Sequence, residues 1–182
     1  MSNRVTEDAG DTLHDTPSAS KSEGESHGAS SKLTARAFEL TNIERSRAGL
    51  PPLRLESRLA AAAQAHSQNM ALKDFFSHTG EGGDTPWDRI QATGYQYSRA
   101  AENLYGGAST AEQAVQGWMQ SPGHRANILN PDLQEIGIGH YFLASDTGSV
   151  NYKHYWTQVF ATPADASQAG ADPAREVSAG RG

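Results

Sequence analysis

The sequence predicts one domain of the α+β class, in which early helices pack on a sheet formed by later strands. Between residues 32 and 120, apolar residues recur at the three- and four-residue spacing of helices. From residue 135 the pattern changes to short strand-like runs separated by a turn. A chain of 182 residues suits one such domain with flexible ends.

Two long helices are expected first. Over residues 32–48 the apolar positions follow helical spacing, and Gly49 with Pro51-Pro52 ends the helix. Residues 57–73 predict a second helix, whose alanine-rich face permits close approach of a neighbouring element.

Two shorter helices follow. Thr85-Pro86 is a helix start, and the helix ends at Gly94. Ser109-Thr110-Ala111-Glu112 has the pattern of a capping box for a helix to about Gln120, which Ser121-Pro122-Gly123 ends.

The last third predicts an antiparallel hairpin. Residues 135–143 and 152–161 are the strands, and the polar cluster at 145–148 suits the turn. The domain is therefore expected over residues 32–162. Residues 1–31 and 163–182 are expected to be disordered or flexible tails, because they hold too few apolar residues to offset the entropy of ordering.

Composition limits the possible functions. The net charge of −6 argues against a nucleic-acid partner, which requires clustered Lys and Arg. The chain has no cysteine, which excludes disulfides and thiolate chemistry. No apolar run suggests a transmembrane segment, and residues 1–31 lack the pattern of a signal peptide. Oligomeric state is not determined by the sequence.

A set of segments in fixed order resembles the CAP superfamily (SCP/PR-1-like), in its cysteine-free bacterial branch. The segments include Asn42-Ile43-Glu44-Arg45, Phe75-Phe76-Ser77-His78, Thr85-Pro86-Trp87-Asp88-Arg89-Ile90, Ala101-Glu102-Asn103-Leu104, Ser121-Pro122-Gly123-His124-Arg125-Ala126-Asn127, Glu135-Ile136-Gly137-Ile138-Gly139 and Trp156-Thr157-Gln158-Val159-Phe160. The resemblance implies a three-layer α-β-α sandwich with a central antiparallel sheet.

The resemblance also implies a cleft. Eukaryotic members carry two His and two Glu there, and His78, Glu102 and His124 match three of the four. Ser121 stands where the second Glu is expected. We therefore expect a cleft around His78, Glu102, Ser121 and His124.

Three hypotheses for this cleft follow. His78 and His124 could bind a divalent metal such as Zn²⁺, with Glu102 as the general base of a protease-like hydrolase. Catalytic zinc sites usually hold three protein ligands, so the serine weakens this hypothesis. The cleft could instead bind a small molecule, lipid or peptide, or its polar groups could be purely structural. The resemblance favours a binding module over an enzyme. It also implies a location at the cell envelope or outside the cell. A cytoplasmic location stays open.

Other polar residues have competing interpretations. His66 fits a core or boundary position, and His140 and His154 could face each other or point to solvent. A Ser-His nucleophile lacks an accompanying oxyanion motif. Arg125 is expected to pair with Asp88 or Glu102.

Overall fold

The computed structural model describes residues 19–164 and confirms the α+β class. Predicted tail residues 1–18 and 165–182 lie outside the described residues. Within 19–164, no helix combines the length and apolar character needed to cross a membrane. The elements are α1 (Ala19–Arg47), β1 (Arg54–Leu55), α2 (Ser57–Leu72), α3 (Pro86–Ala92), β2 (Tyr97–Gly106), α4 (Ala111–Gln120), α5 (Pro122–Ile128), β3 (Glu135–Phe142) and β4 (His154–Pro163).

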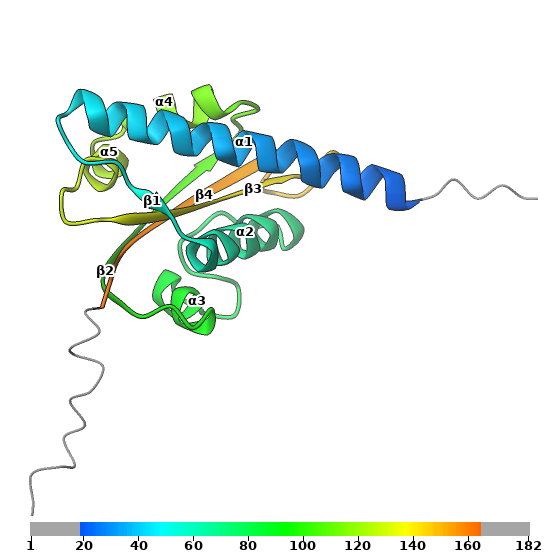
Figure 1. Cartoon of the computed structure of the whole chain (residues 1–182). Helices are drawn as coiled ribbons and strands as arrows, with labels where there is room; N and C mark the ends of the chain where they lie inside the picture. The colour runs from blue at the N-terminus through cyan, green and yellow to red at the C-terminus, as the bar shows by residue number, and fades with distance from the viewer. Residues whose placement is uncertain (1–18, 165–182) are drawn as a thin grey trace, which may run out of the picture.

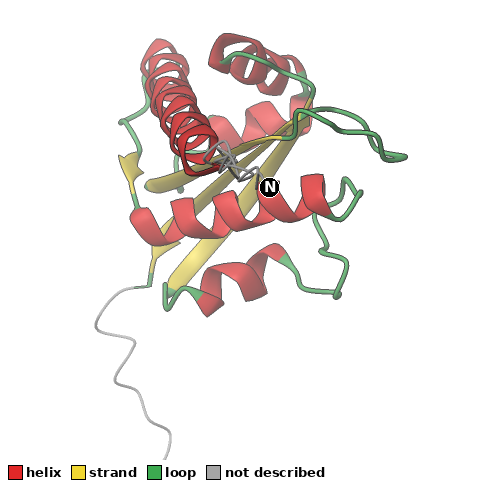
Figure 2. Ribbon diagram, turned by 90° about the vertical axis from the view of Figure 1, so that its right-hand side faces the viewer, coloured by secondary structure: helices red, strands yellow, loops and turns green. Residues whose placement is uncertain are grey.

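Three layers form the domain, as expected. The sheet has the order β1-β3-β4-β2 and lies between α1, α4 and α5 on one face and α2 and α3 on the other (Figures 1 and 2). The pairs β2–β4 and β3–β4 are antiparallel, whereas the two-residue β1 pairs in parallel with β3. The central sheet is thus antiparallel in its three long strands and parallel only at one short edge.

The predicted hairpin is present as β3 and β4. Their register pairs Glu135 with Ala161 at one end and Phe142 with His154 at the other. The long strand β2 was not predicted, because its sequence does not alternate between apolar and polar residues. Pairing with β4 along most of its length stabilises it.

The helix boundaries differ from prediction in three places. Helix α1 begins at Ala19, so the predicted tail boundary at Lys32 lies inside the helix. The N-cap of α4 is Thr110, whose hydroxyl accepts from the backbone N–H of Gln113, and not Ser109. The chain after Gln120 forms a further helix, α5, because Pro122 is tolerated in a first helical turn.

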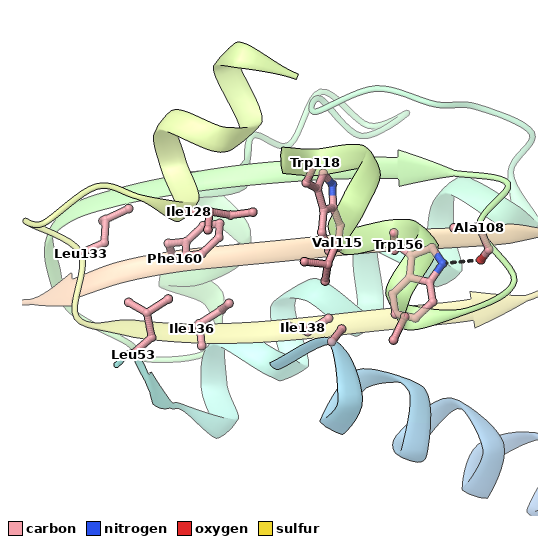
Figure 3. Close-up of a cluster of buried hydrophobic side chains, with 13 residues drawn as sticks. Leu53, Ala108, Val115, Trp118, Ile128, Leu133, Ile136, Ile138, Trp156 and Phe160 are labelled. Atoms are coloured by element: carbon pink, nitrogen blue, oxygen red, sulfur yellow. Dashed lines mark hydrogen bonds between the residues drawn. The ribbon is translucent and has the colours of Figure 1, made fainter. Parts of the chain in front are cut away.

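The main core lies between the sheet and the layer of α1, α4 and α5 (Figure 3). Trp118 and Trp156 are fully buried there and meet edge to face, with ring centroids 6.4 Å apart. Each indole N–H is satisfied by a backbone carbonyl, that of Leu104 at 3.1 Å for Trp118 and that of Ala108 at 2.7 Å for Trp156. The two tryptophans thereby also hold the end of β2 and the turn after it.

Arg45 on α1 joins this layer to the loops around it. Its buried guanidinium donates to the carbonyl groups of Pro51, Ile128, Asn130 and Leu133, at 2.8–3.3 Å. These carbonyls lie after α1, at the end of α5 and in the loop before β3. The forked geometry of arginine suits this bridging, and burial lowers the pKa of Arg45.

Helix α2 packs directly on the backbone of β3. A Cβ atom at Gly137 would overlap backbone atoms of Leu59 and Ala60, and one at Gly139 would overlap backbone atoms of Ala63. Small residues on both sides therefore allow the helix to lie against the strand, as the alanine-rich face of the sequence predicts.

We expect Gly137→Ala to lower the free energy of unfolding by at least about 2 kcal/mol, because the added methyl must displace backbone atoms. Urea denaturation measures the loss. Gly123→Ala is the matched control, since nothing lies within 4 Å of its added Cβ, and it should be neutral or slightly stabilising. Equal effects of the two substitutions would contradict the close contact.

His140 and His154 face each other on β3 and β4, which confirms the paired interpretation. His140 Nε2 lies 3.1 Å from His154 Nδ1, and His140 Nδ1 lies 3.0 Å from the hydroxyl of Ser30 on α1. The alternative of a solvent-facing side chain is wrong for His140, which is 1% exposed. Burial, and to a lesser extent the charge of His154, lowers the pKa of His140 to about 4.

This depressed pKa predicts a loss of stability in acid. The unfolded chain binds a proton at His140 near pH 6.5 and the folded chain only near pH 4, so stability is full above 6.5 and falls between these values. The shift corresponds to about 3 kcal/mol. Urea denaturation from pH 7.5 to 4 should therefore show a shallower pH dependence for His140→Gln than for the wild type. Parallel profiles would contradict the prediction.

Candidate functional site

A buried carboxylate, Glu102 on β2, is the centre of the candidate site. Its side chain is only 2% exposed. One oxygen, Oε1, lies 2.9 Å from Nδ1 of His78, and the other, Oε2, accepts from Nη2 of Arg89 at 2.9 Å. Both oxygens of the carboxylate are therefore engaged, one by an imidazole and one by a guanidinium.

Arg89 on α3 holds this arrangement together. Nη2 also donates to the carbonyl of His78 at 2.9 Å, and Nη1 donates to Asp84, at 2.9 Å to Oδ2 and 3.2 Å to the carbonyl. This guanidinium lowers the pKa of the Asp84 carboxyl group. Arg89 thus fixes the loop that carries His78 against β2.

Arg125 is not the partner of Glu102, and the expectation that it pairs with Asp88 or Glu102 is wrong. Arg125 forms no ion pair within residues 19–164, and Arg89 occupies the position beside Glu102. The sequence signal that could have pointed to Arg89 was the helix start at Thr85-Pro86, which places Arg89 one turn into α3. Nothing in the sequence indicated which carboxylate it would meet.

The loop before His78 has a second anchor in His66. This residue is fully buried on α2, as predicted, and its Nε2 lies 2.9 Å from the carbonyl of Ser77. Burial lowers the pKa of His66, which favours the neutral ring. The residue before His78 is therefore fixed to α2, whereas the His78 side chain is 54% exposed.

A chain of amides lies on the other face of β2. The Asn103 side chain donates to the carbonyl of His124 and to Oε1 of Gln158, both at 3.1 Å. Asn127 donates to Oδ1 of Asn103 at 2.8 Å, and Gln158 donates to the hydroxyl of Thr41 at 2.9 Å. These bonds fix α5 to β2, β4 and α1.

The predicted site residues therefore come from elements on both faces of the sheet. Glu102 and Asn103 are neighbours on a strand, so their side chains point to opposite faces. His78 and Glu102 lie with α2 and α3, and His124 lies on α5. Burial, and then the charge of His78, lowers the pKa of His124, whose buried Nδ1 has no hydrogen-bond partner among the described residues. Ser121 lies at the junction of α4 and α5.

An open groove of about 500 Å³ lies beside Glu102. Its wall on one side is the start of α3, and α5 contributes Asn127 on the other. Trp87 is 41% exposed on its rim. The groove is lined by His78, Thr79, Thr85, Pro86, Trp87, Ala100, Ala101, Glu102 and Asn127. His124 and Ser121 are not among the lining residues.

The residues do not form a ready metal site. No three His, Asp or Glu side chains within the described part of the chain are placed to hold a metal ion. The carboxylate of Glu102 is occupied by Arg89 and His78, which leaves two imidazoles where catalytic zinc usually has three protein ligands. The described residues around Glu102 therefore do not fit a catalytic metal.

The fold agrees with comparisons to known families. Residues 38–160 match the model of the cysteine-rich secretory protein family, CAP. The match covers more than half of the chain, so the chain belongs to this family.

Three similar proteins are bacterial. The uncharacterized protein YkwD of Bacillus subtilis (strain 168) is 40% identical over 125 residues, which cover 69% of this chain and 45% of YkwD. An extracellular protein containing a SCP domain from Bacillus anthracis str. Ames is 31% identical, with a TM-score of 0.64 over 82% of this chain and 45% of that one. An outer surface protein of Borrelia burgdorferi shares the fold, with 20% identity and a TM-score of 0.62 over 70% of this chain and 90% of that one.

The chain thus spans less than half the length of the two more similar relatives.

The buried ion pair predicts a large effect of removing its cation. Arg89→Met leaves the Glu102 carboxylate buried without its guanidinium and should cost about 3–5 kcal/mol of unfolding free energy. The double variant Arg89→Met/Glu102→Gln should cost less than the sum of the two single variants, as measured by urea denaturation. Arg36→Met, which removes exposed ion pairs with Glu39 and Glu112, should stay close to wild type. Additive effects of Arg89 and Glu102 would contradict a direct coupling.

Proposed function

We propose that this CAP domain is a binding module without catalytic activity and that its recognition site is the groove beside Glu102. The observation that carries the proposal is the engagement of both Glu102 oxygens by His78 and Arg89. A carboxylate held in this way positions the groove wall and is poorly suited to accept a proton from water.

The groove itself has features of a recognition surface. It is open, and it combines an exposed indole at Trp87 with the half-exposed imidazole of His78. Exposed aromatic and polar groups around a concavity are typical of sites that bind a small molecule, lipid or peptide. The proposed ligand belongs to one of these classes.

We also propose that the domain acts outside the cytoplasm. Of the structurally similar proteins, the one from Bacillus anthracis is described as extracellular and the one from Borrelia burgdorferi as an outer surface protein. The absence of cysteine is compatible with this location, because an exported domain can fold without disulfides. The core around Trp118 and Trp156 supplies the stability instead.

Nuclear magnetic resonance of the labelled domain tests the proposal with three probes: a random-sequence peptide library, phosphatidylglycerol vesicles and a library of small metabolites. At least one probe should shift resonances of His78, Trp87, Ala100 and Asn127. Trp87→Ala should weaken that binding at least tenfold, about 1.4 kcal/mol. Phe142→Ala is the matched control, since Phe142 is 42% exposed at the opposite end of the sheet.

Two results would overturn the proposal. If no probe perturbs the groove, the polar network is structural alone. If the peptide library is cleaved with Zn²⁺ present and His78→Ala or His124→Ala abolishes cleavage, the domain is a metal-assisted hydrolase.

A further inference from the structure

The groove contains part of an unpaired strand edge. Strand β2 is the last strand of the sheet, and within residues 19–164 it pairs only with β4. The backbone N–H of Gly107 donates to the carbonyl of His154, and the register continues from there without a shift to Arg99. Hydrogen-bonding direction alternates along an antiparallel pair, so the backbone groups of Ala100, Glu102 and Leu104 point away from β4.

Side chains satisfy only part of this edge. Trp118 donates to the carbonyl of Leu104 at 3.1 Å, and Asn127 reaches the carbonyl of Glu102 at 3.5 Å. Both contacts confirm the direction assigned to the even-numbered residues. Within the described residues, the N–H and carbonyl of Ala100 and the N–H of Glu102 have no such partner. These groups belong to residues that line the groove.

The charges around the groove select against an ionic occupant. Glu102, Arg89 and Asp84 are paired with one another, and the Arg89 and Glu102 side chains are nearly buried. The wall therefore offers neutral backbone donors and acceptors in place of a free charge. A second backbone in extended conformation complements such an edge, because it presents the same groups at the same spacing.

We propose that the groove binds an extended peptide segment of a partner, which adds as a strand to the free edge of β2 at Ala100 and Glu102. This inference rests on the proposed function and names the class of ligand. Side chains of an added strand alternate between the two faces of the sheet. An apolar side chain is therefore expected where the peptide faces Trp87 on α3, and a polar one where it faces Asn127 on α5.

Backbone methylation of a peptide tests the inference. A binder is selected from a phage-displayed library of random dodecapeptides and synthesised with each backbone nitrogen methylated in turn. Methylation should weaken binding at least tenfold at alternate positions, where the N–H faces β2, and little at the positions between them. A loss that does not alternate, or no loss at any position, overturns strand addition.

Proline substitutions in the protein give an independent readout. Ala100→Pro removes an N–H that points away from β4, so the fold should persist while peptide binding falls at least tenfold. Ala101→Pro removes a ladder N–H and should lower the melting temperature by roughly 10 °C. If Ala100→Pro destabilises the fold as much as Ala101→Pro does, the methylated peptides alone decide whether the peptide adds as a strand. Undiminished binding by a folded Ala100→Pro variant overturns the inference.

The inference and the proposed function can fail separately. If phosphatidylglycerol vesicles or metabolites perturb the groove resonances and no peptide does, strand addition is wrong and the binding function stands. If no probe reaches the groove, both are wrong.

Discussion

The layer spacing of this domain is set where α2 lies against the backbone of β3. Gly137 and Gly139 leave no room for a side chain between strand and helix, so α2 has one position relative to the sheet. The end of α2 determines where the following loop begins, and His66 fixes that loop at Ser77. The packing of α2 on β3 and the bond from His66 to the loop together bring His78 to Glu102 and Arg89.

The second layer is positioned by different means. Arg45 gathers four backbone carbonyls, and the amides of Asn103 and Asn127 tie α5 to β2. The four groups that accept hydrogen bonds from Arg45 are neutral backbone carbonyls. The groove therefore has one wall fixed by packing of small residues and ion pairs, and another fixed by neutral hydrogen bonds.

The sequence could predict the elements whose signals are local. The hairpin, the start of α3 at Thr85-Pro86 and the alanine-rich face of α2 all depend on residues close together in the chain. Strand β2 could not be predicted because its stability comes from pairing with β4, which lies more than fifty residues later in the sequence, as in the pair Glu102–Val159. The partner of Glu102 could not be predicted for the same reason. Arg89 and Arg125 are equally plausible partners in the sequence, and only the fold brings Arg89 to the carboxylate. The resemblance identified His78 and Glu102, but it could not show that the carboxylate is fully engaged.

The three tryptophans of the chain occupy sharply different environments. Trp118 and Trp156 are completely enclosed, whereas Trp87 stands at the rim of the groove. Emission from the enclosed pair should lie at shorter wavelength and resist a soluble quencher such as iodide. The quenchable, longer-wavelength component should therefore come from Trp87. The native protein thus carries an optical reporter of groove occupancy that requires no label.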